Sequence, residues 1–208
     1  MGNLGITGIT TVIILISLIL IGVTVASVMS GGTSGNAKEK DLNQITNEII
    51  DEISSYLQIK DQKGKYYTIN SEKRIQKIGL LISPLVSQDM DVSKLTIQLC
   101  DGETIRIFSY VGNSEAIGSN SLFEHPIWNN ITNNHFGFIV THDRDNSLVD
   151  YDTLNKNTDM AYVVIRLPDD MTMAKGEKIA VTLFPSTGIT KITVLEAPLP
   201  MKSIVTFE

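Results

Sequence analysis

Residues 1–35 contain no aspartate, glutamate, lysine or arginine, and all 17 basic and 23 acidic residues of the 208-residue chain begin at Lys38. Within this stretch, residues 4–29 are almost entirely aliphatic, threonine or small. As a helix they would be about 39 Å long, which exceeds the roughly 30 Å hydrocarbon core of a bilayer. A uniformly soluble globular fold is therefore disfavoured. A cleavable secretory signal fits poorly, because the basic start of such a signal is absent.

Two interpretations of the charge-free segment are open, a plain membrane anchor and a helix that packs against copies of itself. Small residues recur at Gly5, Gly8, Ser17, Gly22 and Ala26. Small residues let helix backbones approach closely in apolar surroundings, which a simple anchor does not require. The composition therefore favours self-packing. The apolar side chains expected to make the contacts are Ile9, Ile13, Ile16, Ile19, Leu20, Val23 and Val28.

A second helical pattern follows a glycine-rich junction at residues 31–35. Leu42, Ile45, Ile49 and Ile53 recur at steps of three and four residues, which predicts an amphipathic helix over residues 37–58. We expect an N-terminal helical domain at residues 1–59, as one rod weakened at the glycines. Its apolar stripe needs a partner, either the chain's own C-terminal domain or a neighbouring subunit.

From residue 60 the hydrophobic period changes from 3.6 to 2, which predicts strands. The Asp101-Gly102 pair between two alternating runs indicates a hairpin. The predicted fold class is α+β, with a long N-terminal hydrophobic helix followed by an all-β sandwich or small barrel at residues 60–208. Residues 112–135 are expected to form a surface loop. The strands are expected at residues 79–83, 95–99, 104–110, 137–141, 161–167, 178–184, 190–195 and 203–207.

Composition and motifs argue against several functions. The net charge is −6 and there is no basic stripe, so a nucleic-acid partner is excluded. The single cysteine, Cys100, excludes an intramolecular disulfide. The three histidines, His125, His135 and His142, do not have the spacing of a helical metal pair. A faint nucleophile-elbow pattern at residues 112–116 lacks the following helix that such an elbow needs. The sequence therefore predicts neither an enzyme nor a required cofactor.

One acidic stretch could bind a metal ion. Asp143, Asp145, Asn146 and Ser147 lie close together and offer oxygen ligands of the kind that Ca²⁺ prefers. The glycine and terminal glutamate of an EF-hand are missing. An ordinary turn, stabilised by bonds from side chains to the backbone, explains the same residues. Both interpretations stay open.

A second candidate for modification or binding is the sequon Asn130-Ile131-Thr132, the only one in the chain. It lies in the polar loop predicted above, where a glycan on Asn130 could be tolerated.

Several stretches resemble the archaellins, the archaeal flagellins of the type IV pilin-like superfamily. Residues 8–14, GITTVII, and 25–29, VASVM, are similar to the opening of mature archaellins. Residues 143–148, DRDNSL, followed by Asp159, resemble a stretch of the archaellin head, and the two last predicted strands resemble the family's ending. Thr10 stands where the family usually has a second glycine. The absence of a basic leader is what a processed chain is expected to show.

The resemblance implies the structural subunit of an extracellular archaellum, a rotating filament that drives swimming. It implies a helical homo-oligomer, possible participation of a second archaellin type, and residence in the membrane before assembly. It also implies processing by a prepilin-type peptidase and contact with the archaellum motor platform. Some family members carry head glycans and bound metal. The alternatives are an archaeal adhesion pilin of the same architecture and a membrane-anchored β-domain that binds a ligand.

Overall fold

The computed structural model describes residues 56–69, 71–87, 89–132, 134–186, 189–199 and 202–207, which form the greater part of the predicted head. The predicted helix at residues 4–29, with its candidate packing side chains, lies outside the described residues. So does most of the predicted amphipathic helix. Among the residues that are described, no helix is long and apolar enough to cross a membrane.

The described part of the chain is built on a nine-stranded sheet in the order β10-β9-β4-β5-β6-β8-β2-β1-β11. All neighbouring strands are antiparallel except β5 and β6, which are parallel. The strands are β1 (Leu57–Ile69), β2 (Glu72–Pro84), β4 (Thr96–Cys100), β5 (Ile105–Ala116), β6 (His135–His142), β8 (Met160–Arg166), β9 (Lys178–Phe184), β10 (Lys191–Glu196) and β11 (Ile204–Thr206). A separate two-stranded sheet pairs β3 (Met90–Asp91) with β7 (Thr153–Leu154).

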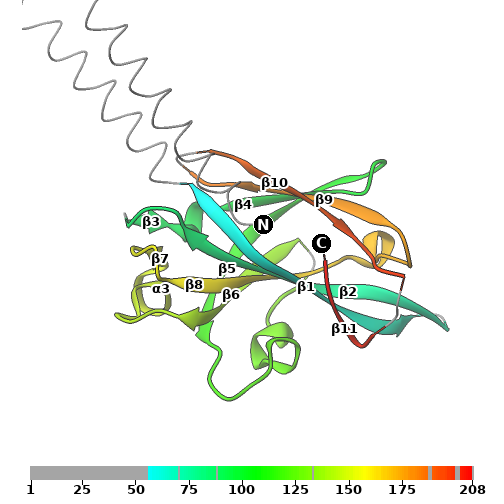
Figure 1. The fold of residues 1–208 in the computed structure, drawn as a ribbon, viewed down its shortest axis with the longest axis horizontal. Coiled ribbons are helices and arrows are strands. Elements are labelled where there is room, and N and C mark those ends of the chain that lie inside the picture. The colour runs from blue at the N-terminus through cyan, green and yellow to red at the C-terminus, as the bar shows by residue number, and fades with distance from the viewer. Residues whose placement is uncertain are drawn as a thin grey trace, which may run out of the picture. The chain divides into compact units, whose positions relative to one another are not determined.

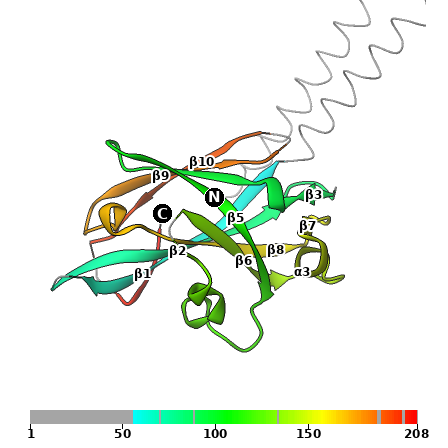
Figure 2. The same ribbon diagram turned by 180° about the vertical axis from the view of Figure 1, so that it is seen from behind.

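The large sheet curls so that β10, β9 and β4 lie over β1, β2 and β8, as both views show (Figures 1 and 2). Polar contacts join the two sides: Lys191 Nζ donates to Tyr56 Oη at 3.1 Å, and Gln62 Nε2 donates to Thr193 Oγ1 at 3.1 Å. The main hydrophobic core fills the curl and includes Phe108, Phe136 and Phe138. The expected sandwich or small barrel is thus built as one continuous curled sheet.

A second hydrophobic cluster lies on the outer face of β6, β8 and β2. Two short helices, η2 (Leu122–Glu124) and η3 (Pro126–Asn129), cover this face, and they form the coil at the bottom of Figure 1. Trp128 stacks on Phe123 at 6.0 Å between ring centroids, and its Nε1 donates to the carbonyl of Leu122 at 2.7 Å. The greater part of the predicted loop at residues 112–135 is therefore held against the sheet by its apolar residues.

The predicted strands after residue 78 are all present, including the hairpin at Asp101-Gly102. Two local predictions were wrong. Leu57 and Gln58, assigned to the end of the amphipathic helix, instead open β1, because they pair with Pro84 and Ser83 of β2. β5 continues to Ala116, well into the predicted loop, because its second half pairs with β6.

Candidate metal centre

The first side of the candidate site is the turn between β6 and the short helix α3 (Ser147–Tyr151). Asp143 Oδ2 accepts a hydrogen bond from the backbone N–H of Leu148 at 2.8 Å and so closes the turn over the start of α3. Asn146, just before the helix, has a left-handed backbone with φ of 57°. Asparagine tolerates this conformation better than most residues. The sequence thus bends here and brings Asp143 and Asp145 to one side of the turn.

The second side is the loop that leads into β8. Asp159 is fully buried, and its Oδ2 accepts backbone N–H groups from Asn155 at 3.2 Å and Lys156 at 2.8 Å. A carboxylate that bonds two successive N–H groups holds the loop in one conformation. Asp159 is therefore fixed in position by its own loop.

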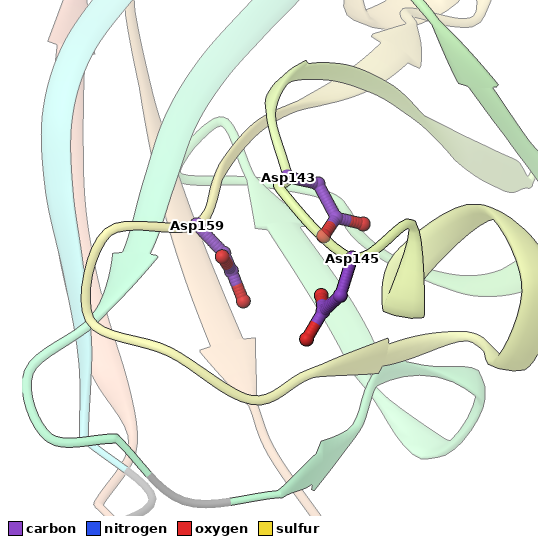
Figure 3. Close-up of side chains that lie close together, drawn as sticks. All are labelled: Asp143, Asp145 and Asp159. Atoms are coloured by element: carbon purple, nitrogen blue, oxygen red, sulfur yellow. The ribbon is translucent and has the colours of Figure 1, made fainter.

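The two loops bring three carboxylates together. One carboxylate oxygen from each of Asp143, Asp145 and Asp159 lies within 4.8 Å of the other two, and Figure 3 shows the three side chains gathered between the loops. The Oδ1 atoms of Asp143 and Asp159 are buried and have no hydrogen-bond donor among the described residues. Ser147 Oγ and Asn155 Oδ1, from the same two loops, are buried and unsatisfied in the same way.

The electrostatics of the three carboxylates differ. Burial, followed by the nearby charges of Asp145 and Asp159, raises the pKa of Asp143 above its ordinary value. The pKa of Asp145 is lowered well below its usual range, chiefly because Lys156 and Asn155 donate to its Oδ2. The ammonium of Lys156 thus neutralises Asp145, the most exposed of the three carboxylates, and not the carboxylates of Asp143 and Asp159.

The oxygens gathered here are of the kind that a hard cation binds. An ordinary turn accounts for the backbone hydrogen bonds that the Oδ2 atoms of Asp143 and Asp159 accept. It provides no partner for their buried Oδ1 atoms. An unsatisfied buried oxygen costs about 1–3 kcal/mol, and a cation among the three carboxylates could offset this cost for Asp143 and Asp159. Ca²⁺ takes six to eight oxygen ligands from carboxylates, amides, hydroxyls and water. The donor set here consists of such oxygens.

The structure places the predicted residues unequally. Asp143 and Asp145 lie in the cluster, whereas Asn146 is exposed and makes no side-chain capping bond. Ser147 is buried at the start of α3. The residue that the metal hypothesis omitted is Asp159. Its position before a nearly continuous apolar strand was the available signal, since a carboxylate at the entrance to a buried strand needs specific partners.

The remaining candidates have simpler surroundings. Asn130 is exposed at the end of η3, so its side chain is accessible to a glycan. His125 is buried, with Nε2 bonded to the Ala116 carbonyl at 3.1 Å and Nδ1 accepting the N–H of Ile127 at 3.2 Å. These are ordinary structural hydrogen bonds. Cys100 ends β4 and is partly buried.

Known proteins resemble the chain over nearly its full length. Flagellin B3 of Methanocaldococcus jannaschii is 28% identical over 201 residues, which cover 93% of this chain and 90% of that protein. Flagellin B4 of Pyrococcus abyssi is 28% identical over 197 residues, covering 88% and 89% of the two chains.

Two solved structures share the fold. The crystal structure of archaeal flagellin FlaB1 from Methanocaldococcus jannaschii matches with a TM-score of 0.64 and 16% identity, covering 73% of this chain and 95% of that chain. The archaeal flagellum of Methanospirillum hungatei matches with a TM-score of 0.54 and 13% identity, covering 97% and 99%. The model of the archaeal-type flagellin family matches residues 5–195, from the charge-free segment to β10. The chain therefore belongs to the archaeal-type flagellin family.

Proposed function

We propose that residues 4–29 of many copies pack together as the core of an archaellum filament, and that the head at residues 60–208 forms its outer surface. As an archaeal-type flagellin, the chain is a structural subunit of this filament, which is a cell-surface appendage outside the cell. The observation that carries the proposal is the family match over residues 5–195, because it includes both the charge-free segment and the head.

Polymerisation follows from the physical chemistry of the core segment. Burying apolar surface between helices stabilises the assembly by roughly 25 cal/mol per Å². Because residues 1–35 carry no charge, neighbouring helices can pack without leaving an unpaired ion in the core. A contact between two different surfaces of the same chain gives a ring where its rotation closes and an open helical filament where it does not, and the filament is the second case. The acidic head keeps the outer surface soluble.

Assembly requires partners that the sequence pattern suggests. The charge-free segment can reside in the membrane before polymerisation, because it is apolar and, as a helix, would be more than long enough to cross the hydrocarbon core. We infer that a prepilin-type peptidase processes the chain and that the archaellum motor platform receives it. A second flagellin type could share the filament.

Electron microscopy of sheared surface appendages, with mass spectrometry of the same material, tests the filament function. The proposal predicts this chain as a major component of thin helical filaments. Its absence from such filaments would refute the proposal. Deletion of the gene separates a flagellin from an adhesion pilin: loss of swimming with normal attachment supports the flagellin, and loss of attachment alone supports the pilin.

A structural metal site in the head is the second part of the proposal. Asp143, Asp145 and Asp159 would hold the ion, and Ca²⁺ is the species that their oxygens favour. The bound ion would neutralise the facing carboxylates and join the turn before α3 to the loop before β8. Its role is thus to stabilise the head and not to perform chemistry.

Thermal melting tests the metal site. The purified protein should melt at a higher temperature in Ca²⁺ than in chelator, and Mg²⁺ should give a smaller increase. The double variant Asp143→Ala and Asp145→Ala should melt at one temperature in both conditions. Asp150→Ala, an exposed acid on α3 outside the cluster, is the matched control and should keep the response to Ca²⁺. If the unaltered protein melts at the same temperature with and without Ca²⁺, the cluster is an ordinary turn and not a metal site.

Glycosylation of Asn130 is the third part. Its exposed position at the end of η3 supports it. Mass spectrometry of the peptide that contains Asn130, compared between the natural chain and an Asn130→Gln variant, tests it directly.

A further inference from the structure

The outer face of β10, β9, β4 and β5 carries large hydrophobic side chains that the described residues leave exposed. Six large hydrophobic side chains on these strands are between 37% and 62% exposed. Side chains alternate between the two faces of a strand, and the intervening residues Ile97, Leu99, Val181 and Leu195 are buried in the core. The six exposed side chains are Ile105, Ile107, Val111, Phe184, Ile192 and Val194.

Strand register brings most of these side chains into two rows. One row runs Ile192, Thr182, Gln98 and Ile107, and the next runs Val194, Ala180, Cys100 and Ile105. Directly opposed residues of neighbouring strands point to the same side of a sheet. The rows therefore form one continuous surface, which we call the outer apolar face.

Within the described strands, no charged residue stands in the two rows of the outer apolar face. A strand of a sheet with one face in water normally alternates apolar residues on the core side with polar residues on the water side. Charges occur here at the rim, where Lys178 pairs with Glu196 at 2.9 Å. Apart from Lys178 and Glu196, the outward positions of the four strands are Thr96, Gln98, Cys100, Ile105, Ile107, Ser109, Val111, Ala180, Thr182, Phe184, Ile192 and Val194.

The outer face of β6 and β8 provides a comparison, because its apolar side chains are covered by another part of the head. On β6 and β8 the outward residues Ile139, Tyr162 and Val164 are buried, because η2, η3 and Trp128 pack over them. Among the described residues, no comparable segment lies over the outer apolar face. The exposed hydrophobic side chains of this half of the sheet are therefore of the kind that is normally buried, but no described part of the head buries them.

We propose that the outer apolar face is the surface through which one head contacts a second copy of this chain in the filament. The size of the face supports that occupant. With strands about 4.8 Å apart and residues of one face about 6.8 Å apart, the face measures roughly 400 Å². A stable interface between free proteins needs about 800 Å² from each partner, so the face is too small to hold two free heads together.

A contact of this size suits subunits that are already joined elsewhere. Once the N-terminal segments hold two copies side by side, each head meets its neighbour at an effective concentration near the millimolar range, as in an intramolecular reaction. Weak apolar contact is then sufficient, and patches of this size on otherwise polar proteins are commonly interaction sites. The inference thus rests on the proposed filament function.

Cys100 provides a built-in probe, because it is the only cysteine and lies in the second row of the face. A hydrophilic maleimide should react with Cys100 several-fold more slowly in intact filaments than in subunits dissociated from the same filaments. A control variant, Cys100→Ser with Ile204→Cys, moves the thiol to an exposed position on β11 at the opposite edge of the sheet. This control should react at similar rates in both states.

Substitution gives the second test. Ile107→Lys places a charge in the face and should lower the temperature at which filaments dissociate or abolish them, whereas Ile204→Lys, the same change at an isoleucine that is 46% exposed, should leave filaments normal. Ile107→Thr, which keeps a β-branched side chain, should produce an intermediate loss if the lysine variant does not fold. Equal Cys100 reactivity in filaments and subunits, or equal behaviour of the Ile107→Lys and Ile204→Lys variants, would overturn the inference. In that case wild-type filaments would still form, so the filament function itself would stand.

Discussion

At the scale of single residues, the ionisation of Asp143 is linked to the stability of the head. The pKa of Asp143 is raised because burial and the charges of Asp145 and Asp159 disfavour the carboxylate. In the absence of a cation, the folded state therefore holds the proton more tightly than the unfolded state. Stability falls as the pH rises from the ordinary pKa of the group through its raised folded value. A bound cation reverses this balance, because it favours the carboxylate.

We predict that Asp143→Asn changes stability with opposite sign in the two conditions. In chelator at neutral pH the variant should melt higher than the natural chain, since it removes an unfavourable buried charge. In Ca²⁺ it should melt lower, since it removes a ligand. For a chain of this length, each kcal/mol of change in the free energy of unfolding should shift the melting temperature by about 2–4 °C. Calorimetric melting in both buffers measures it, and a lower melting temperature in both would contradict the account of Asp143.

At the same scale, the sequence could predict part of the metal site. Asp143 and Asp145 could be chosen as candidate ligands because they are close together in the chain. Asp159 could not be chosen on spacing alone, because only the loop before β8, held by its bonds to Asn155 and Lys156, turns its carboxylate toward the others. Local sequence predicts the turn, whereas the ligand set depends on tertiary structure.

At the scale of elements, the strands with a clear apolar pattern could be predicted and those that depend on pairing could not. β8 is a nearly continuous apolar run and β9 is largely apolar, so their sequence indicated them directly. β1 contains the polar run Lys60 to Lys65 and has no comparable pattern. It becomes a strand because its backbone pairs with β2 along its whole length and with β11 on the other side. Backbone pairing leaves no signature in the side chains.

The cover formed by η2 and η3 can be tested at Trp128. The indole is 2% exposed, and Lys77 Nζ lies 4.8 Å from its ring centroid. Trp128→Ala should lower the free energy of unfolding by about 3–5 kcal/mol, as expected for loss of a large buried aromatic side chain. Trp128→Phe should lose less, because it retains most of the contact with Phe123. Denaturant unfolding followed by circular dichroism measures both, and an unchanged midpoint for the alanine variant would show that the cover contributes little.

At the scale of the whole molecule, the chain divides its tasks along the sequence. In the proposed account, the charge-free segment provides self-association, the curled sheet forms the head, and the outer apolar face provides a further contact. A charge in the core segment should therefore stop assembly without unfolding the head, because the two parts are stabilised by different contacts.

Ile16→Asp tests this division. An unpaired carboxylate buried among apolar helices costs several kcal/mol, and the cost recurs at every subunit. Cells that produce this variant should have no filaments, although the protein is still made and its head keeps the melting temperature of the natural chain. Ile16→Leu, which preserves volume and apolar character, is the control and should form filaments. Negative-stain microscopy with immunoblotting checks both, and normal filaments from the aspartate variant would refute the core role of residues 4–29.

The central claim is that this chain builds a filament around residues 4–29, with the head outside. The most direct measurement is a helical reconstruction by electron cryo-microscopy of filaments sheared from cells. The account predicts a central bundle of helices whose side-chain density matches residues 4–29 of this sequence, surrounded by curled β-sheet heads. A filament axis built by another protein, or heads of this chain at the axis, would contradict the account.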